Sequence, residues 1–162
     1  MSRRHDALVL AFYHHARGFS YVVFEGAPSL VEWGMSDIAG PQKARGCLRR
    51  LALLLSQYCP DALVLRGVSH NAGTKRGAKL LDAMESLAQR KGIYTAAVSR
   101  KQIQAAFASL GSPTRYAIVE AIVKQIPVLA PFVPPPRKIW NGEDRRMGLF
   151  DAASLALTFL AE

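Results

Sequence analysis

The sequence predicts an α/β (α+β) fold, with a five-stranded mixed sheet whose first three strands are antiparallel and with helices on both sheet faces. Two observations carry this prediction. Three apolar runs rich in β-branched and aromatic residues follow one another near the N-terminus, separated by short turns. After them, segments with helical apolar spacing alternate with two short runs of strand type.

The first two strands lie in the stretch 7–24, which reads ALVLAFYHHARGFSYVVF. The first strand runs into Tyr13-His14-His15, and the chain returns as the second strand after a turn that contains Gly18. The third strand is expected over 30–35. A strand and turn of this kind often present a catalytic acid, but this stretch contains no acidic residue.

The remaining elements are predicted from apolar periodicity and from glycine and proline positions. The expected order is a helix over 41–58, a strand over 61–65, a loop over 67–77, a helix over 78–91, a strand over 93–98, helices over 99–107 and 112–126, an extended crossing over 127–136 and a final helix over 142–160. In sheets of this kind a site tends to form at the carboxyl ends of central strands. Those ends are expected at Tyr13 and at Arg66.

Composition and charge limit the classes of protein to which this chain can belong. The 162 residues fit a single domain, residues 1–162, that is long enough to bury a core. No apolar run reaches the ~18 residues of a membrane helix, and the N-terminus lacks signal-peptide character, so we expect a cytoplasmic protein with no membrane partner. Lys and Arg number 21 against 12 acids, a net charge of +9, which favours a polyanionic partner such as nucleic acid.

Four segments resemble a known family over nearly the whole chain. In order they are RGFSYVVF, PDALVL, SRKQIQAAFASLGSPTRYAIVEAIV and MGLFDAASLALTF. Together they resemble the RuvC-type Holliday-junction resolvase branch of the RNase H-like superfamily. The resemblance implies an RNase H-like fold and a nuclease in which acids on the first strand, fourth strand and final helix bind two divalent metal ions.

The acids that the resemblance implies are mostly replaced. The acid of the first strand falls on Ala11, Tyr13 or a neighbour such as His14, and the acid of the fourth strand falls on Arg66. On the final helix Asp151 is retained, but the second acid, three residues later, is Ser154. We therefore expect a former metal site that no longer binds metal, made of Tyr13, His14, Arg66 and Ser154.

Asp144 and Asp151 are the residual candidates for catalysis. They lie seven residues apart, so one continuous helix would place both on the same face. Two metal ions held close together need several surrounding carboxylates, and an arginine in the same pocket adds to their repulsion. We therefore expect no metal cofactor, and we expect Arg66 to pair with Asp151 or Asp144. The alternative is a site for Mg²⁺ or Mn²⁺.

Two other arrangements remain open on the sequence. His14, His70 and Asp151 could form a transition-metal site, since histidine binds zinc or manganese more readily than magnesium. Ser69, His70 and Asp151 could be drawn as a catalytic triad, although no nucleophile-elbow motif supports one.

Basic residues are the candidates for nucleic-acid binding. Lys101 and Arg115 match positions where the resemblance implies contacts to the DNA backbone, and Arg100 lies beside them. Lys75, Arg76, Arg137 and Lys138 could extend the same surface through salt-dependent phosphate contacts. The predicted helix over 41–58 also has a cationic outer face.

The sequence thus favours a RuvC-like nucleic-acid-binding protein, with DNA as the expected partner and without catalysis. The first alternative is a divalent-metal-dependent endonuclease, resembling Holliday-junction resolvases, that uses Asp144 and Asp151 with other ligands. The second is a protein-interaction module. A homodimer is also open, because the helix corresponding to 78–91 helps to form the dimer in resolvases, although its apolar stripe is expected to be chiefly core.

Overall fold

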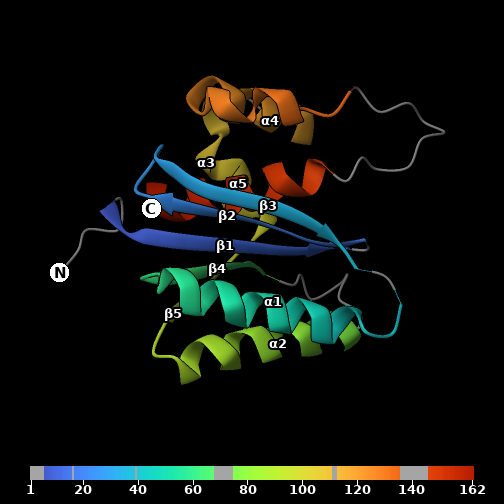
Figure 1. Cartoon of the computed structure of the whole chain (residues 1–162). Helices are drawn as coiled ribbons and strands as arrows, with labels where there is room; N and C mark the ends of the chain where they lie inside the picture. Colours follow the sequence, from blue (N-terminus) through green and yellow to red (C-terminus); the bar gives the residue numbers. More distant parts are fainter. Residues whose placement is uncertain (1–5, 16, 39, 68–74, 111–112, 136–145) are drawn as a thin grey trace.

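The computed structural model describes residues 6–15, 17–38, 40–67, 75–110, 113–135 and 146–162. Within them a mixed sheet lies at the centre (Figure 1) and consists of β1 (Leu8–His15), β2 (Gly18–Glu25), β3 (Leu30–Asp37), β4 (Ala62–Arg66) and β5 (Tyr94–Val98). The strand order is β3-β2-β1-β4-β5. β1, β2 and β3 pair antiparallel, whereas β4 pairs parallel with β1 and β5. The predicted sheet is confirmed.

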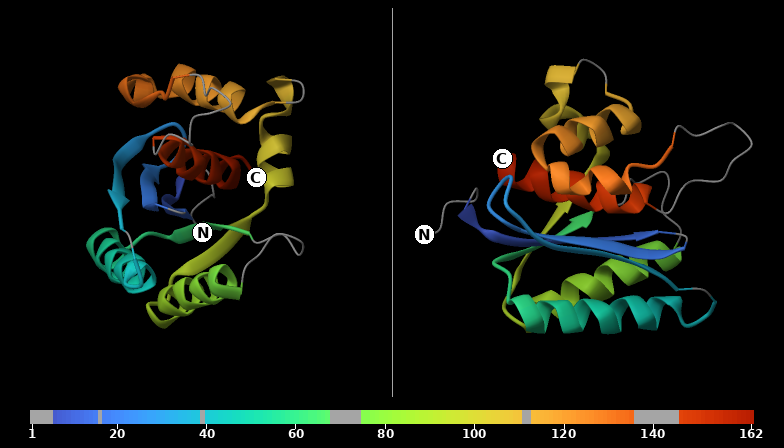
Figure 2. Two further views of the ribbon diagram at one scale, coloured as in Figure 1. Left: turned by 90° about the vertical axis from the view of Figure 1, so that its right-hand side faces the viewer. Right: turned by 45° about the horizontal axis from the view of Figure 1, so that its top comes forward.

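The helices are α1 (Lys43–Tyr58), α2 (Lys75–Arg90), α3 (Arg100–Ala106), α4 (Arg115–Gln125) and α5 (Met147–Ala161), with 3₁₀ turns η2 (Ala108–Leu110) and η3 (Pro127–Phe132). α1 and α2 cover one face of the sheet, and α5 covers the other, with α3 and α4 packed against α5 (Figure 2). In the described part of the chain, no helix combines the length and apolar character needed to cross a bilayer.

The close pairing of β2 with β3 depends on Gly18. Its φ is 150°, and a Cβ at this position would lie 2.0 Å from the carbonyl oxygen of Ser36 on β3. Only glycine allows this close approach of two backbones. On its other side β2 pairs with β1 in a register in which Tyr13 faces Ser20.

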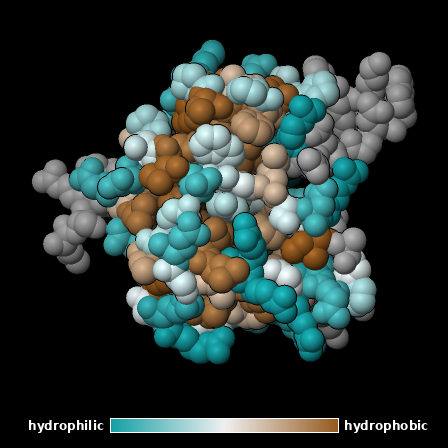
Figure 3. All heavy atoms as spheres, in the orientation of Figure 1, coloured by the Kyte–Doolittle hydropathy of each residue, from teal (hydrophilic) through white to brown (hydrophobic). Residues whose placement is uncertain are grey.

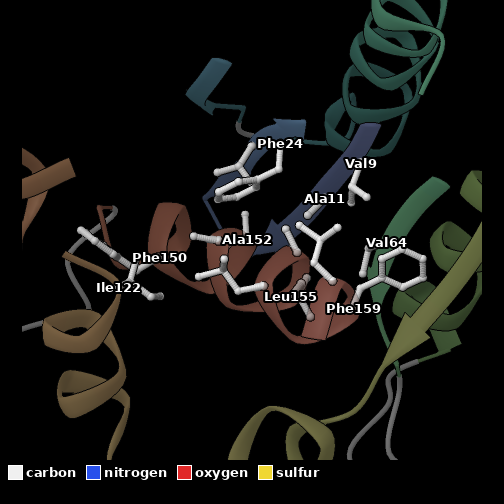
Figure 4. Packing of buried hydrophobic residues seen from close by; sticks show 14 of the residues in the cluster. Val9, Ala11, Phe24, Val64, Ile122, Phe150, Ala152, Leu155 and Phe159 are labelled. Atoms are coloured by element: carbon white, nitrogen blue, oxygen red, sulfur yellow. The ribbon is translucent and has the colours of Figure 1, made fainter. Parts of the chain in front are cut away.

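The core beneath α5 is the larger of two apolar clusters. Residues from Ala152 to Leu160 of α5 are all buried, because this helix lies between the sheet and the α3–α4 layer. Figure 4 shows side chains of α5 facing those of β1, β2 and β4 across the interface. The same helix therefore holds the core together and carries Asp151 at its N-terminal end.

The core beneath α1 and α2 is made by the alternate side chains of the same strands. Leu10 and Phe12 of β1 point to this face, and Phe12 stacks on Phe19 with ring centroids 4.9 Å apart. Leu81 and Met84 of α2 are buried in it, which confirms that the apolar stripe of this helix is core. Hydrophilic side chains gather over the outer sides of α1 and α2, at the bottom of Figure 3.

Three predicted boundaries are wrong. α2 begins at Lys75, not at Ala78, so the helix extends into the predicted loop. The segment predicted as extended forms η3 from Pro127, because proline fits the first turn of a helix and Leu129 is buried there. The last helix begins at Met147 and not at Gly142.

Candidate functional site

A pocket of about 180 Å³ opens at the carboxyl ends of β1 and β4, on the face covered by α5. Side chains from β1, β4, α3, α4 and α5 meet there, as expected for a site at the carboxyl ends of central strands. Its described lining is Tyr13, Arg66, Arg100, Ile103, Gln104, Pro113, Arg115, Ile118, Val119, Phe150, Asp151, Ser154 and Leu155.

Tyr13 and Arg66 end the two central strands and contact each other in the pocket. Strand alternation turns both side chains toward α5, and an Arg66 guanidinium nitrogen donates a hydrogen bond of 3.0 Å to the Tyr13 hydroxyl oxygen. The guanidinium carbon also lies 5.7 Å from the centre of the tyrosine ring. Burial, and then the nearby charge of Asp151, raise the pKa of Tyr13, so its hydroxyl stays protonated.

Asp151 is held by Arg115 from the neighbouring helix. Thr114 caps α4 by accepting a hydrogen bond from the backbone N–H of Ala117 at 3.1 Å, and this places Arg115 at the first position of the helix. Arg115 donates from Nε to Asp151 Oδ1 at 3.2 Å and from its terminal nitrogen to Oδ2, a bidentate pair. One turn later, the Ser154 hydroxyl donates to the backbone oxygen of Asp151 at 2.7 Å.

The expected pairing of Arg66 with Asp151 is therefore wrong. Within the described residues Arg115 makes the ion pair with Asp151, and Arg66 binds Tyr13 instead. Asp144 lies outside the described residues. The prediction that Asp144 and Asp151 share one helix face therefore stays a prediction, and α5 as described begins at Met147.

His14 is separated from the pocket by the pleat of β1. It follows Leu10 and Phe12 in alternation, on the α1 face, while Tyr13 faces α5. Burial lowers the pKa of His14, and the positive charges of Lys43, His15 and Arg66 lower it further. His14 and Tyr13 thus point to opposite faces of β1, and the predicted metal site of His14, His70 and Asp151 stays a prediction. Ser69 and His70 lie outside the described residues.

The described side chains of the pocket do not fit a pair of divalent metal ions. Two unit charges about 4 Å apart repel by about 4 kcal/mol at an effective dielectric constant of 20, and two dications by about four times as much. The described lining offers one carboxylate, already paired, and three arginines. Nowhere in the described ranges do three or more His, Cys, Asp or Glu side chains gather as metal ligands would.

Comparison with solved structures shows which known proteins have a similar architecture. Thermus thermophilus RuvC is similar at a TM-score of 0.67 and 20% identity, covering 95% of each chain. The yeast mitochondrial Holliday junction resolvase is similar at a TM-score of 0.59 and 14% identity, over 96% of this chain and 78% of that chain. The fold is that of RuvC-type resolvases. Fowlpox virus resolvase with Holliday junction DNA is also similar, at a TM-score of 0.51 and 13% identity, over 95% of this chain and 97% of that one.

Comparison by sequence adds nothing to this assignment. No family model matches the chain, and no curated protein matches it. The RuvC-type fold thus rests on the three-dimensional arrangement, which confirms the fold that the four sequence segments predicted.

The predicted nucleic-acid-binding residues divide into four groups. Arg100 and Arg115 line the pocket, and Lys101 is exposed on α3 outside it. Lys75 and Arg76 belong to the first turn of α2, where only the backbone is described. The remaining two, Arg137 and Lys138, lie outside the described residues.

Sequence reasoning missed the apolar interior of the pocket. It is formed by Ile103 of α3, Ile118 and Val119 of α4, and Phe150 and Leu155 of α5. In the sequence these residues are ordinary members of apolar helix stripes, and nothing distinguishes them from core. Their second role depends on how three helices cross, which spacing along the chain does not reveal.

Proposed function

We propose that this chain binds nucleic acid through arginines at the position where resolvases of this fold bind metal, and that it does not cleave the phosphodiester bond. The observation that carries the proposal is the contact between Arg66 and Tyr13 at the ends of β4 and β1. The family resemblance implies carboxylates at these two strand ends. A cation and a phenol in their place favour an anion and disfavour a metal ion.

The charge of the pocket supports the same proposal. Arg66, Arg100 and Arg115 outnumber Asp151, so the described lining carries a net charge of two positive. Guanidinium groups bind phosphate oxygens in bidentate fashion without any metal. The whole chain carries a net charge of +9, which attracts a polyanion at long range.

DNA is the proposed partner. Two solved structures of this fold, from Thermus thermophilus and from fowlpox virus, are described as complexes with Holliday junction DNA. The basic pocket at the carboxyl ends of β1 and β4 would contact the phosphate backbone, and such contacts do not depend on base sequence. We also propose a cytoplasmic location. We further propose a homodimer, and light scattering would test this oligomeric state.

The test is binding and cleavage of four-way junction DNA, linear duplex and single-stranded RNA, in EDTA and in Mg²⁺ or Mn²⁺. We expect DNA binding that is unchanged by EDTA, weakens steeply with salt and is accompanied by no cleavage. Arg66→Ala should reduce the slope of affinity against salt by about 1. Arg90→Ala is the matched control, because this exposed arginine lies at the C-terminal end of α2 and does not line the pocket.

Two results would overturn the proposal. Cleavage in Mg²⁺ or Mn²⁺ that Asp151→Asn abolishes would establish an active nuclease using Asp151. Absence of DNA and RNA binding at about 50 mM salt, where phosphate contacts are strong, would favour a protein-interaction module.

A further inference from the structure

The pocket is built from two chemically different parts. Val119, Phe150 and Leu155 are each 1% exposed, so they form the interior of the pocket. Arg100 and Arg115 are exposed and therefore lie toward its mouth. A phosphate group alone would leave the apolar interior unused, and an apolar ligand alone would leave the arginines unused.

The size of the pocket restricts what can enter it. A volume of about 180 Å³ is below the ~300–1,000 Å³ of ordinary ligand pockets, so a fragment such as one planar ring system fits better than a large ligand. A nucleotide joins such a ring to an anionic phosphate through a sugar. Apolar and aromatic walls with a few polar groups are the surroundings in which proteins hold an unstacked base.

We infer that the pocket holds one unpaired nucleotide of the bound nucleic acid, with the base in the apolar interior and the adjacent phosphate on Arg100 and Arg115. The inference rests on the proposed function and narrows it to nucleic acids that contain unpaired nucleotides. Tyr13, which is 8% exposed and lines the pocket, supplies aromatic contact to the base. The phosphate competes with Asp151 for Arg115, since both are anions.

Tyr13 can also recognise the edge of the base. Its oxygen accepts the hydrogen bond from Arg66, so its own proton can be donated into the pocket. The raised pKa of Tyr13 keeps that proton in place at neutral pH. Gln104 lines the pocket as well and provides an amide that can both donate and accept.

The first experiment measures competition for the pocket. A short single-stranded DNA containing 2-aminopurine is bound to the full chain, and inorganic phosphate, a deoxynucleoside or the corresponding deoxynucleoside 5′-monophosphate is added. We expect the monophosphate to compete at least about tenfold better than either part alone, because it uses both parts of the pocket. Equal competition by phosphate, or equal competition by an oligoglutamate peptide, would overturn the inference.

The second experiment fills the pocket. Ile103 is half-buried on α3 and lines the pocket, so Ile103→Trp would occupy the interior. We expect binding of single-stranded DNA to weaken by about tenfold. Ala106→Trp is the matched control, because Ala106 is exposed on the same helix and does not line the pocket. Circular dichroism and thermal unfolding establish that both variants fold, and the competition experiment decides the matter if Ile103→Trp does not.

The two proposals can fail separately. DNA binding that persists with a normal salt slope, while Ile103→Trp and the monophosphate have no effect, would overturn the nucleotide pocket and leave the proposed function standing. Perfect duplex bound as tightly as single strands would overturn it too, because flipping a paired base costs stacking energy. Loss of all nucleic-acid binding in the unmodified chain would refute the proposed function itself.

Discussion

The two faces of the sheet bury different kinds of side chain. The face under α1 and α2 is apolar, with Phe12 stacked on Phe19. The face under α5 holds all the buried polar side chains found among the described residues, which are Ser20, Ser154 and Thr158. The α5 face also ends in the pocket with Tyr13 and Arg66, whereas the other face ends at His14.

This difference shows how one strand serves stability and function at once. Phe12 and Tyr13 are neighbours in β1, yet the pleat sends Phe12 into a closed core and Tyr13 into a site. The site lies on the face whose core already contains hydroxyl groups. Substitutions on the two faces should therefore separate loss of stability from loss of binding.

The largest expected effect is on the apolar face. Phe12 is 1% exposed, and Phe12→Ala should lower the free energy of unfolding by about 3–5 kcal/mol, as for other buried aromatic residues. Tyr13→Phe on the opposite face keeps the ring and removes one hydrogen bond, so it should cost only about 0.5–1.5 kcal/mol. Urea unfolding measures both. Similar losses for the two variants would contradict the separation of the faces.

The next effect concerns binding at the α5 face. Asp151→Asn removes the carboxylate that holds Arg115 and makes the pocket more positive. DNA affinity at low salt should rise, by about three- to tenfold. Asp82→Asn makes the same change in net charge on the exposed side of α2 and should have a smaller effect. Weaker binding by Asp151→Asn than by Asp82→Asn would show that Asp151 does not oppose the ligand.

A smaller effect distinguishes the buried hydroxyl groups. Thr158 is 1% exposed, and its hydroxyl oxygen has no hydrogen-bond partner in the described structure, so Thr158→Val should stabilise the protein by about 1 kcal/mol. Ser154→Ala removes a hydroxyl that is bonded to Asp151 and should instead destabilise by about 0.5–1.5 kcal/mol. Thermal unfolding should show opposite shifts. Destabilisation of both variants would indicate that the Thr158 hydroxyl is satisfied as well.

The smallest effect is a dependence of stability on pH. Since the pKa of His14 is lowered in the folded state, the unfolded chain binds the proton at higher pH than the folded chain. The free energy of unfolding should therefore fall as the pH drops below the ordinary histidine value of 6.5, by less than about 1.4 kcal/mol per pH unit. His14→Gln should flatten this slope in urea titrations at several pH values. An unchanged slope would show that His14 is not the group responsible.

The sequence by itself determined the layers and the residue types at the strand ends. Periodicity is local, so the five strands, the stripe of α2 and the capping box of Ser99 with Gln102 could all be predicted from neighbours along the chain. That Tyr13 and Arg66, and not acids, end the first and fourth strands is equally visible in the sequence. Helix ends were predicted less well: α2 begins at Lys75 and η3 at Pro127, because the residues at an element's ends carry a weaker pattern than those inside it.

Only the tertiary structure decided which side chains of different elements contact each other. Arg66 was expected to bind Asp151, but the pair is made by Arg115, 36 residues away in the sequence, because α4 crosses α5 at that point. The pleat of β1 directs His14 and Tyr13 to opposite faces of the strand, and the amino-acid composition does not reveal this. The apolar interior of the pocket likewise exists only where α3, α4 and α5 meet. Such contacts depend on the relative placement of whole elements, and the pattern within each element is silent about that placement.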